Sequence, residues 1–299
     1  MRRFSESSSL GGRLSSRFVA GMEIEDVLRA AEELNANGIS ATLDSLGESV
    51  GTQAEARRSA DTYHRLLDAI SERKLNANVS VKLTQMGLAL DPALAYQIAS
   101  ELVSHAAGLG NFVRIDMEDS SFTDVTLDIV RRLRASDTGG LASRADAGHV
   151  GVVIQAYLYR SLADVEALVR DRIRVRLCKG AYQEPPDVAF PAKSDVDANY
   201  VKLMKILLQS GVYHGIATHD EKMIDATRSF VQEKGIDLKS FEFQMLYGVR
   251  RDLQRSLVSE GFGMRVYIPF GPEWYPYFMR RLAERPANVL FLARNFFRS

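Results

Sequence analysis

The chain has 299 residues, of which 46% are hydrophobic and 25% are charged, as in an ordinary globular protein. Lysine and arginine together number 38, as do aspartate and glutamate, so the overall charge does not indicate a nucleic-acid-binding protein. Cys178 is the single cysteine, which excludes an internal disulfide and a cysteine-only metal site and favours a reducing compartment, and no apolar run approaches the length of a membrane span.

The first twenty residues, MRRFSESSSLGGRLSSRFVA, are rich in arginine and serine and have Glu6 as their only acid. This composition resembles a mitochondrial transit peptide, but it also suits the loose basic terminus of a bacterial protein, which we favour. We therefore expect a bacterial cytoplasmic protein, with a mitochondrial one as the alternative. The regular pattern begins near residue 22, so we expect an N-terminal arm and helix over 1–38 and one folded domain over 39–299.

Short stretches of β-branched or apolar residues then alternate with stretches of helical pattern. Strands are expected at 39–44, 78–83, 111–117, 149–157, 172–180, 214–220, 241–248 and 264–271. Helices are expected at 23–37, 52–75, from 91 onward, and at 123–135, 161–170, 195–210, 221–234 and 250–260. Strict alternation predicts a parallel sheet, and eight such units indicate a (βα)8 TIM-like barrel. A doubly wound open sheet is the alternative, although no G-x-G-x-x-G or Walker motif follows a strand.

In such a barrel, functional residues gather at the carboxyl ends of the strands. Those ends carry Asp44, Lys82, Asp116, Glu118, Gln155, Arg176, Lys179, Thr218, His219, Gln244 and Tyr267. Because a barrel interior favours branched apolar side chains, charges there must be paired or must meet a ligand. Their concentration at one mouth indicates a polar ligand.

The strand sequence RVRLCKGAY is the most informative. Alternation places Arg174, Arg176 and Cys178 on one face and Val175 and Leu177 on the other. Because valine and leucine suit the outer face that helices cover, we expect Arg176 to point into the lumen and to meet an anion or the electron-rich edge of a ring. Cys178 is interpreted as a small core residue rather than a nucleophile.

His219, with acidic residues at nearby strand ends, suggests a metal site. However, a metal-binding barrel normally carries several histidines at strand ends, and two of the five histidines here fall within predicted helices. We therefore predict no metal. The pair Thr218 and His219 precedes a predicted helix, where it suits a phosphate at least as well.

The stretch 275–288 reads YPYFMRRLAERPAN and predicts a final helix bounded by prolines. Spacings of three and four residues place Tyr277, Arg280, Arg281 and Glu284 on one face. Adjacent arginines beside an aromatic residue and a carboxylate suit a forked clamp for a small anion such as a carboxylate. A solvated arginine pair with a salt bridge is the alternative.

Eight motifs appear in order along the chain: SVKLTQ, RIDMED, VVIQAYL, VRLCKGAY, IATHD, FEFQMLYG, RVYIPFG and YFMRRLAERPAN. Together they resemble the monofunctional FAD-dependent proline dehydrogenases, from about Ile39 to the C-terminus. VRLCKGAY and YFMRRLAERPAN are the most specific. The resemblance implies that 39–299 is the catalytic domain, with noncovalent FAD at the carboxyl mouth of a distorted (βα)8 barrel and the final helix over that mouth.

The resemblance also implies the site residues. Substrate would contact Lys82, Asp116, Leu246, Tyr267, Tyr277, Arg280 and Arg281, with Arg280, Arg281 and Lys82 holding the proline carboxylate. FAD would contact Gln155, Arg176, Cys178, Lys179, Gly180, Ala181, Lys193, Thr218, His219 and Glu284. The catalytic set would be Lys82, Asp116, Arg176, Tyr267, Arg280 and Arg281. Some family members have tryptophan where this chain has Gln183 and valine where it has Cys178, so contacts at those two positions are less secure.

The implied reaction is oxidation of L-proline to Δ1-pyrroline-5-carboxylate by hydride transfer to FAD. Arg176 would stabilise the negative charge that builds up on the flavin. Electrons would pass to a quinone, which implies a transient peripheral contact with the inner membrane, and oligomers are compatible with the resemblance. Two alternatives remain open. One is a Schiff-base aldolase barrel with Lys82 or Lys179 as the nucleophile, and the other is a non-catalytic ligand-binding barrel.

Two finer hypotheses concern the mouth. Tyr267 is expected to press on the proline ring where a 4-hydroxyl would project, and so to select against hydroxyproline. Glu48, in the loop after the first strand, is expected to pair with Arg280 and close the site over substrate, because the first and eighth strands of a closed barrel are neighbours. The alternative is that Glu48 caps the helix that follows it.

Overall fold

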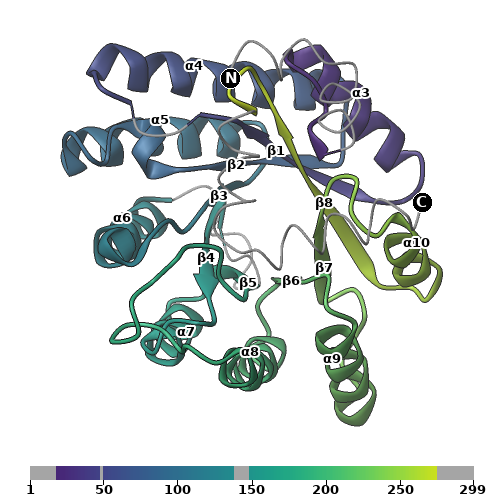
Figure 1. Ribbon diagram of the computed structural model, residues 1–299. Helices are drawn as coiled ribbons and strands as arrows, with labels where there is room; N and C mark the ends of the chain where they lie inside the picture. Colours follow the sequence, from purple (N-terminus) through teal and green to yellow (C-terminus); the bar gives the residue numbers. More distant parts are fainter. Residues whose placement is uncertain (1–17, 48–49, 138–147, 275–299) are drawn as a thin grey trace, which may run out of the picture.

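The computed structural model describes residues 18–47, 50–137 and 148–274, which form a closed barrel of eight parallel strands (Figure 1). The strands are β1 (Ser40–Ser45), β2 (Ala77–Val81), β3 (Val113–Ile115), β4 (Val150–Gln155), β5 (Arg174–Cys178), β6 (His214–Ala217), β7 (Phe241–Leu246) and β8 (Gly263–Phe270). The helices are α3 (Ile24–Asn35), α4 (Gln53–Glu72), α5 (Pro92–Gly108), α6 (Thr123–Ser136), α7 (Ser161–Arg170), α8 (Lys193–Leu208), α9 (Glu221–Lys234) and α10 (Arg251–Ser259). Two short 3-10 helices, η1 (Leu83–Met86) and η2 (Ser120–Phe122), follow β2 and β3.

The barrel closes where β1 pairs with β8. The two strands run parallel from the pair Ser40 and Arg265 to the pair Ser45 and Phe270. Every other neighbouring pair of strands is also parallel. The predicted (βα)8 barrel is therefore confirmed, and the open doubly wound sheet is wrong.

Many element boundaries differ by one to three residues from those predicted. The pattern predicts a strand over 111–117, but β3 covers three residues. At the amino end of β3, the Asn111 side chain accepts a hydrogen bond from the Phe112 N–H at 2.6 Å and donates one to the Ala77 carbonyl at 3.1 Å. The Asn111 side chain thus takes the place of backbone hydrogen bonds between β2 and β3 at the amino end of β3. Helix α8 begins at Lys193, two residues before the predicted start at 195.

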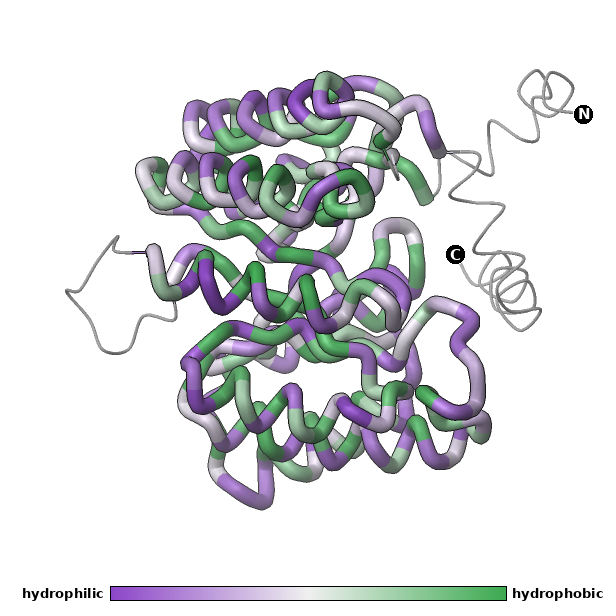
Figure 2. The backbone as a smooth tube through the Cα atoms, turned by 90° about the vertical axis from the view of Figure 1, so that its left-hand side faces the viewer, coloured by the Kyte–Doolittle hydropathy of each residue, from purple (hydrophilic) through white to green (hydrophobic). Residues whose placement is uncertain are grey.

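The helices surround the barrel and turn one apolar face toward it. In Figure 2, hydrophilic and hydrophobic segments alternate along the outer helices, as expected for elements that are half covered. Helix α4 begins with a capping box, in which Thr52 accepts from the Glu55 N–H at 3.2 Å and Glu55 accepts from the Thr52 N–H at 3.2 Å. None of the described helices combines the length and apolar character needed to cross a membrane.

The first described helix, α3, covers the seam of the barrel. It contacts both β1 and β8 (Figure 1) and buries Val27, Leu28, Ala30 and Ala31. Residues that precede the first strand therefore complete the ring of helices at the place where the barrel closes.

The large apolar core lies between the strands and the helices, whereas the lumen is polar. Alternation explains the division, because successive side chains of a strand point to opposite faces. Buried polar residues on the strands or just beyond their ends include Thr42, Asp44, Asn78, Ser80, Lys82, Arg114, Gln155, Arg176, Glu242 and Gln244. This barrel is therefore filled by polar side chains rather than by layers of branched apolar ones.

Leu43 tests the apolar core. It is fully buried in β1, so we expect Leu43→Ala to lower the free energy of unfolding by about 2–5 kcal/mol. Leu90→Ala makes the same chemical change at a side chain that is 45% exposed, and should cost less than about 0.5 kcal/mol. Equilibrium denaturation of both variants measures the difference, and equal losses would contradict this packing.

Candidate active site

Asp116, which directly follows β3, is the centre of the polar cluster at the carboxyl mouth. Its carboxylate accepts hydrogen bonds from Ser80 Oγ at 2.6 Å, Arg176 Nη1 at 2.9 Å and the Tyr267 hydroxyl at 2.8 Å. The Lys82 ammonium lies 3.8 Å away. Burial alone would raise the pKa of Asp116, but Arg176, Lys82 and the hydrogen bonds together lower it below its usual value. Asp116 is therefore an ionised anchor that fixes three neighbouring side chains.

Lys82, directly after β2, is held by a second carboxylate. Its Nζ lies 3.2 Å and 3.3 Å from the two oxygens of Asp44, which is fully buried. Burial raises the pKa of Asp44, and the charge of Lys82 opposes this shift. The Tyr63 hydroxyl lies 3.3 Å from Asp44 Oδ1 and fixes the carboxylate from the helix side. The pair thus places an ammonium group at the mouth.

Arg176 points into the lumen, as the alternation in its strand predicts. Its Nε donates to Gln244 Oε1 at 2.5 Å, and its guanidinium lies over the Tyr267 ring at 5.1 Å from the centroid. Gly215 makes room for this arrangement, because a Cβ there would lie 2.3 Å from Gln244 Nε2. Arg176 therefore meets both partners that its burial requires, an anion in Asp116 and an aromatic ring.

A second charged cluster lies beyond β5, at the amino ends of α8 and α9. Lys179 and Lys193 form ion pairs with the same two acids, Asp197 and Asp220. The Lys179 ammonium lies 2.6 Å from Asp220 Oδ2. These contacts lower the pKa of both aspartates despite the opposing effect of burial. The structure thus brings together the two lysines that the resemblance assigns to FAD.

Gln155 at the end of β4 links this wall to the loop after β5. Its Nε2 donates to the Glu118 carbonyl at 2.8 Å, and its Oε1 accepts from the Ala181 N–H at 3.3 Å. Gly180 precedes Ala181 with φ of 121°, and a Cβ there would meet the Tyr157 ring at 2.3 Å. Only glycine can occupy this position without displacing the ring.

Thr218 and His219 follow β6. His219 Nε2 accepts a hydrogen bond from the Leu246 N–H at 2.9 Å, so the proton of the neutral imidazole is on Nδ1. Cys178 is half-buried and packs against the apolar core, in agreement with its interpretation as a core residue. No group of three or more histidine, cysteine or acidic side chains suited to a metal occurs within 18–47, 50–137 and 148–274.

Several predicted site residues lie outside the described residues. They are Glu48 of the gate, and Tyr277, Arg280, Arg281 and Glu284 of the final helix. The clamp and the gate therefore remain predictions from the sequence.

Several residues that hold the two clusters together had no role predicted from the sequence. Asp44 and Gln244 were noted as polar strand residues without a role, whereas Ser80 and Asp197 were missed. The signals were present: Ser80 alternates with Lys82 on the lumen side of β2, and Asp197 lies four residues after Lys193 on one helix face.

Comparison with known proteins decides the family. The family model described as proline dehydrogenase matches residues 27–294. The chain belongs to the proline dehydrogenase family. The resemblance read from the motifs is thereby confirmed, and the chain is an oxidoreductase.

Individual proteins of known sequence support the same family assignment. The chain is 43% identical over 284 residues to a proline dehydrogenase of Deinococcus radiodurans, covering 94% of this chain and 89% of that protein. It is 43% identical over 282 residues to proline dehydrogenase 2 of Bacillus subtilis, covering 94% and 90%. A crystal structure of proline utilization A (PutA) from Bdellovibrio bacteriovorus, inactivated by N-propargylglycine, matches with a TM-score of 0.84 and 25% identity. That match covers 92% of this chain and 33% of the PutA chain, so this chain spans about a third of PutA.

Asp116→Asn tests the central carboxylate. At neutral pH we expect a loss of roughly 3–5 kcal/mol in unfolding free energy, because Arg176 and Lys82 would keep buried charges without Asp116. A carboxylate with a lowered pKa stabilises the fold above its ordinary value of 3.8, and this contribution is lost as the pH falls through the folded pKa. The gap between variant and wild type should therefore shrink below about pH 4.

The matched control is Asp128→Asn, at a side chain that is 66% exposed on α6. It should change stability by less than about 0.5 kcal/mol at any pH. Urea denaturation of all three proteins between acidic and neutral pH provides the measurement. A gap for Asp116→Asn that stays constant with pH would contradict the ionised anchor.

Proposed function

We propose that this chain oxidises L-proline to Δ1-pyrroline-5-carboxylate, with noncovalent FAD as the hydride acceptor and a quinone as the final electron acceptor. The observation that carries the proposal is the cluster of Lys82, Asp116, Arg176 and Tyr267 at the barrel mouth. It occurs in a chain that is 43% identical to proteins named proline dehydrogenase.

The residues at the ends of β4, β5 and β6 fit FAD in chemistry and position. The three strands are neighbours in the barrel, so their ends form one wall. Arg176, Lys179 and Lys193 would supply hydrogen-bond donors to a dinucleotide, and Lys193 stands at the amino end of α8, where backbone N–H groups favour anions. Gln155, Cys178, Gly180, Ala181, Thr218 and His219 complete the wall that would hold the cofactor.

The charges of the described cluster favour a role for the predicted arginine clamp. Lys82 and Arg176 are balanced by Asp44 and Asp116, so this cluster has no positive charge in excess. A substrate carboxylate bound there needs additional cations. Arg280 and Arg281 would supply them, with Lys82 as the third group that holds the carboxylate and orients the proline ring.

The remaining residues orient the ring and control charge. Tyr267, held by Asp116, would pack against the proline ring, and Leu246 would provide an apolar wall. Asp116 is a positioning group rather than a general base, because its lowered pKa and three hydrogen bonds make it a poor proton acceptor at neutral pH. Proline would therefore bind with its amine already neutral. Arg176 would stabilise the negative charge that develops next to it.

The structure bears on both rival functions. A Schiff-base aldolase needs a neutral lysine, but Lys82 lies beside Asp44 and Asp116, and Lys179 beside two further carboxylates. An amine in such ion pairs is an ammonium ion, which is no nucleophile. A non-catalytic ligand-binding barrel does not require a charged mouth in which Tyr267 is held by Asp116.

Cell location and electron transfer are further parts of the proposal. A quinone acceptor is lipid-soluble, so a cytoplasmic enzyme would meet it by transient contact with the inner membrane. The basic first twenty residues keep a mitochondrial location as the alternative. Glu48 pairing with Arg280 would close the mouth over proline during turnover.

The direct test is spectroscopic. Purified protein should be yellow, release intact FAD on denaturation because no covalent bond holds it, and bleach under anaerobic conditions with L-proline but not with D-proline. A colourless protein that sodium borohydride inactivates in the presence of a carbonyl substrate would instead support the aldolase.

Tyr267 allows a test of substrate choice with two variants. Tyr267→Ser removes the ring, so kcat/KM for L-proline should fall roughly tenfold or more and the preference over 4-hydroxyproline should narrow. Tyr267→Phe keeps the ring and loses the hydrogen bond to Asp116, so kcat/KM should fall about 2- to 12-fold with the preference kept. Steady-state kinetics with L-proline and 4-hydroxyproline provides the measurement. If both variants show the same preference for L-proline, the Tyr267 ring does not select against hydroxyproline.

A further inference from the structure

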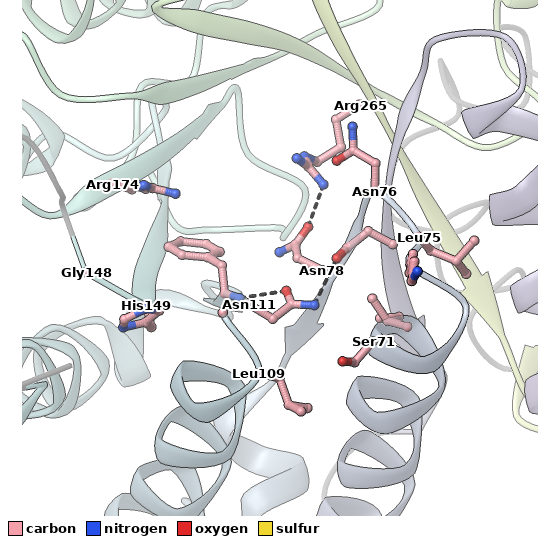
Figure 3. Close-up of a pocket in the computed structure, with 15 residues that line it drawn as sticks. Ser71, Leu75, Asn76, Asn78, Leu109, Asn111, Gly148, His149, Arg174 and Arg265 are labelled. Carbon is pink, nitrogen blue, oxygen red and sulfur yellow. Dashed lines mark hydrogen bonds between the residues drawn. The ribbon is translucent and has the colours of Figure 1, made fainter. Parts of the chain in front are cut away.

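The barrel has a second opening at the end opposite the mouth. A pocket of about 490 Å³ lies at the amino ends of the strands (Figure 3). Polar side chains face it from several elements, including Asn78, Asn111, His149, Arg174 and Arg265. We call it the outer pocket. It lies away from the clusters described above, which gather at the carboxyl ends.

The outer pocket adjoins a smaller cavity inside the lumen. This inner chamber has a volume of about 60 Å³ and shares Asn78, Phe112, Arg174 and Arg265 with the outer pocket. A single water needs roughly 10–15 Å³ measured in this way, so the chamber has room for a few waters or one small ion.

Arg114 of β3 lines the inner chamber and is only 5% exposed. Its Nη1 donates to the Val152 carbonyl at 3.2 Å and the Arg174 carbonyl at 2.6 Å, and its guanidinium lies over the Phe112 ring. Among the described residues, no hydrogen bond uses its Nε or Nη2, and no carboxylate comes within 4.0 Å. A buried guanidinium thus retains donors without an anionic partner.

The other charges of the chamber do not balance Arg114. Glu242, the acid among the described lining residues, already accepts from Arg265 Nε at 2.6 Å and from Gln244 Nε2 at 2.6 Å. Nearby His214 adds no negative charge, and burial followed by the charge of Arg114 lowers the pKa of His214 to about 3. Arg176 is matched by Asp116. Arg114 therefore has no anionic partner among the described residues, in a site with room for a ligand.

We propose that the inner chamber binds one small monovalent anion against Arg114, either a halide or the carboxylate group of a small acid that enters through the outer pocket. A charged guanidinium in a low-dielectric lumen needs a counter-ion, and the chamber provides space and donors for one. The Asn78 side-chain oxygen accepts hydrogen bonds from Arg265 Nη1 at 2.9 Å and from Thr42 Oγ1 at 2.7 Å. These bonds fix the orientation of the Arg265 guanidinium and the Thr42 hydroxyl beside the chamber.

Other residues that line the chamber are connected to the mouth by an unbroken chain of hydrogen bonds, which Arg114 itself does not join. Arg265 and Gln244 share Glu242 Oε1, Gln244 accepts from Arg176 at 2.5 Å, and Arg176 binds Asp116. The anion would therefore stabilise a network that also positions the groups of the proposed proline site.

Anion-dependent thermal stability tests the proposal. Sodium bromide and sodium acetate would be titrated separately over the millimolar range into the purified full chain, with the bulky sulfonate MES keeping ionic strength constant. We expect a saturable rise in melting temperature of roughly 2–4 °C with at least one of the two anions. A rise with bromide indicates the halide, and a rise with acetate alone indicates the carboxylate. No rise with either anion would overturn the proposal.

Arg114→Met removes the charge and keeps an unbranched apolar side chain, so the rise should vanish. Arg255→Met removes one charge at an exposed position of α10 and should leave the rise unchanged. A rise that persists in Arg114→Met would refute the site. If that variant does not fold, crystals of the unmodified protein are soaked in the anion that raised the melting temperature. Bromide must then give an anomalous peak, or acetate a difference-density peak, within hydrogen-bonding distance of Arg114, and the absence of that peak overturns the proposal.

Discussion

Buried charges need partners, and this requirement organises the lumen of the barrel. Asp116 binds Arg176, Tyr267 and Ser80, and Arg176 continues through Gln244 to Glu242 and Arg265. The contacts of Asp116 with Arg176 and Tyr267, and of Arg176 with Gln244, cross the lumen between strands that are not neighbours in the sheet. One connected set of ionic hydrogen bonds thus fills the space that apolar layers occupy in an ordinary barrel. Each side chain in this network has a fixed orientation because the side chains that it contacts are themselves fixed.

The sequence was sufficient for the architecture. Period-2 alternation and regular spacing located all eight strands, and alternation in RVRLCKGAY placed Arg176 in the lumen, where it lies. Local patterns determine which way a side chain points, but they do not determine what it meets across the barrel. The partnership of Arg176 with Asp116 depends on stagger between distant strands, which sequence spacing does not encode.

Other features were inaccessible for similar reasons. At the amino end of β3, one amide of Asn111 competes with the backbone, and strand propensity does not register that competition. The pairing of Lys179 and Lys193 with the same two aspartates requires the amino ends of α8 and α9 to be adjacent. The inner chamber is a cavity beside Arg114 that the side chains of several distant strands leave unfilled. The spacing of residues along the sequence does not predict such a cavity.

The pairing of β1 with β8 also constrains how the polypeptide reaches its native state. Arg265 Nη1 donates to the Ala41 carbonyl across a separation of 224 residues, so this contact forms only when nearly the whole chain has left the ribosome. Until then α3 lacks its β8 surface, and Asp44 and Lys82 stay hydrated at an open sheet edge. Their dehydration must accompany the final loop closure. Pairing of β1 with β8 therefore also completes the burial of Asp44 and Lys82.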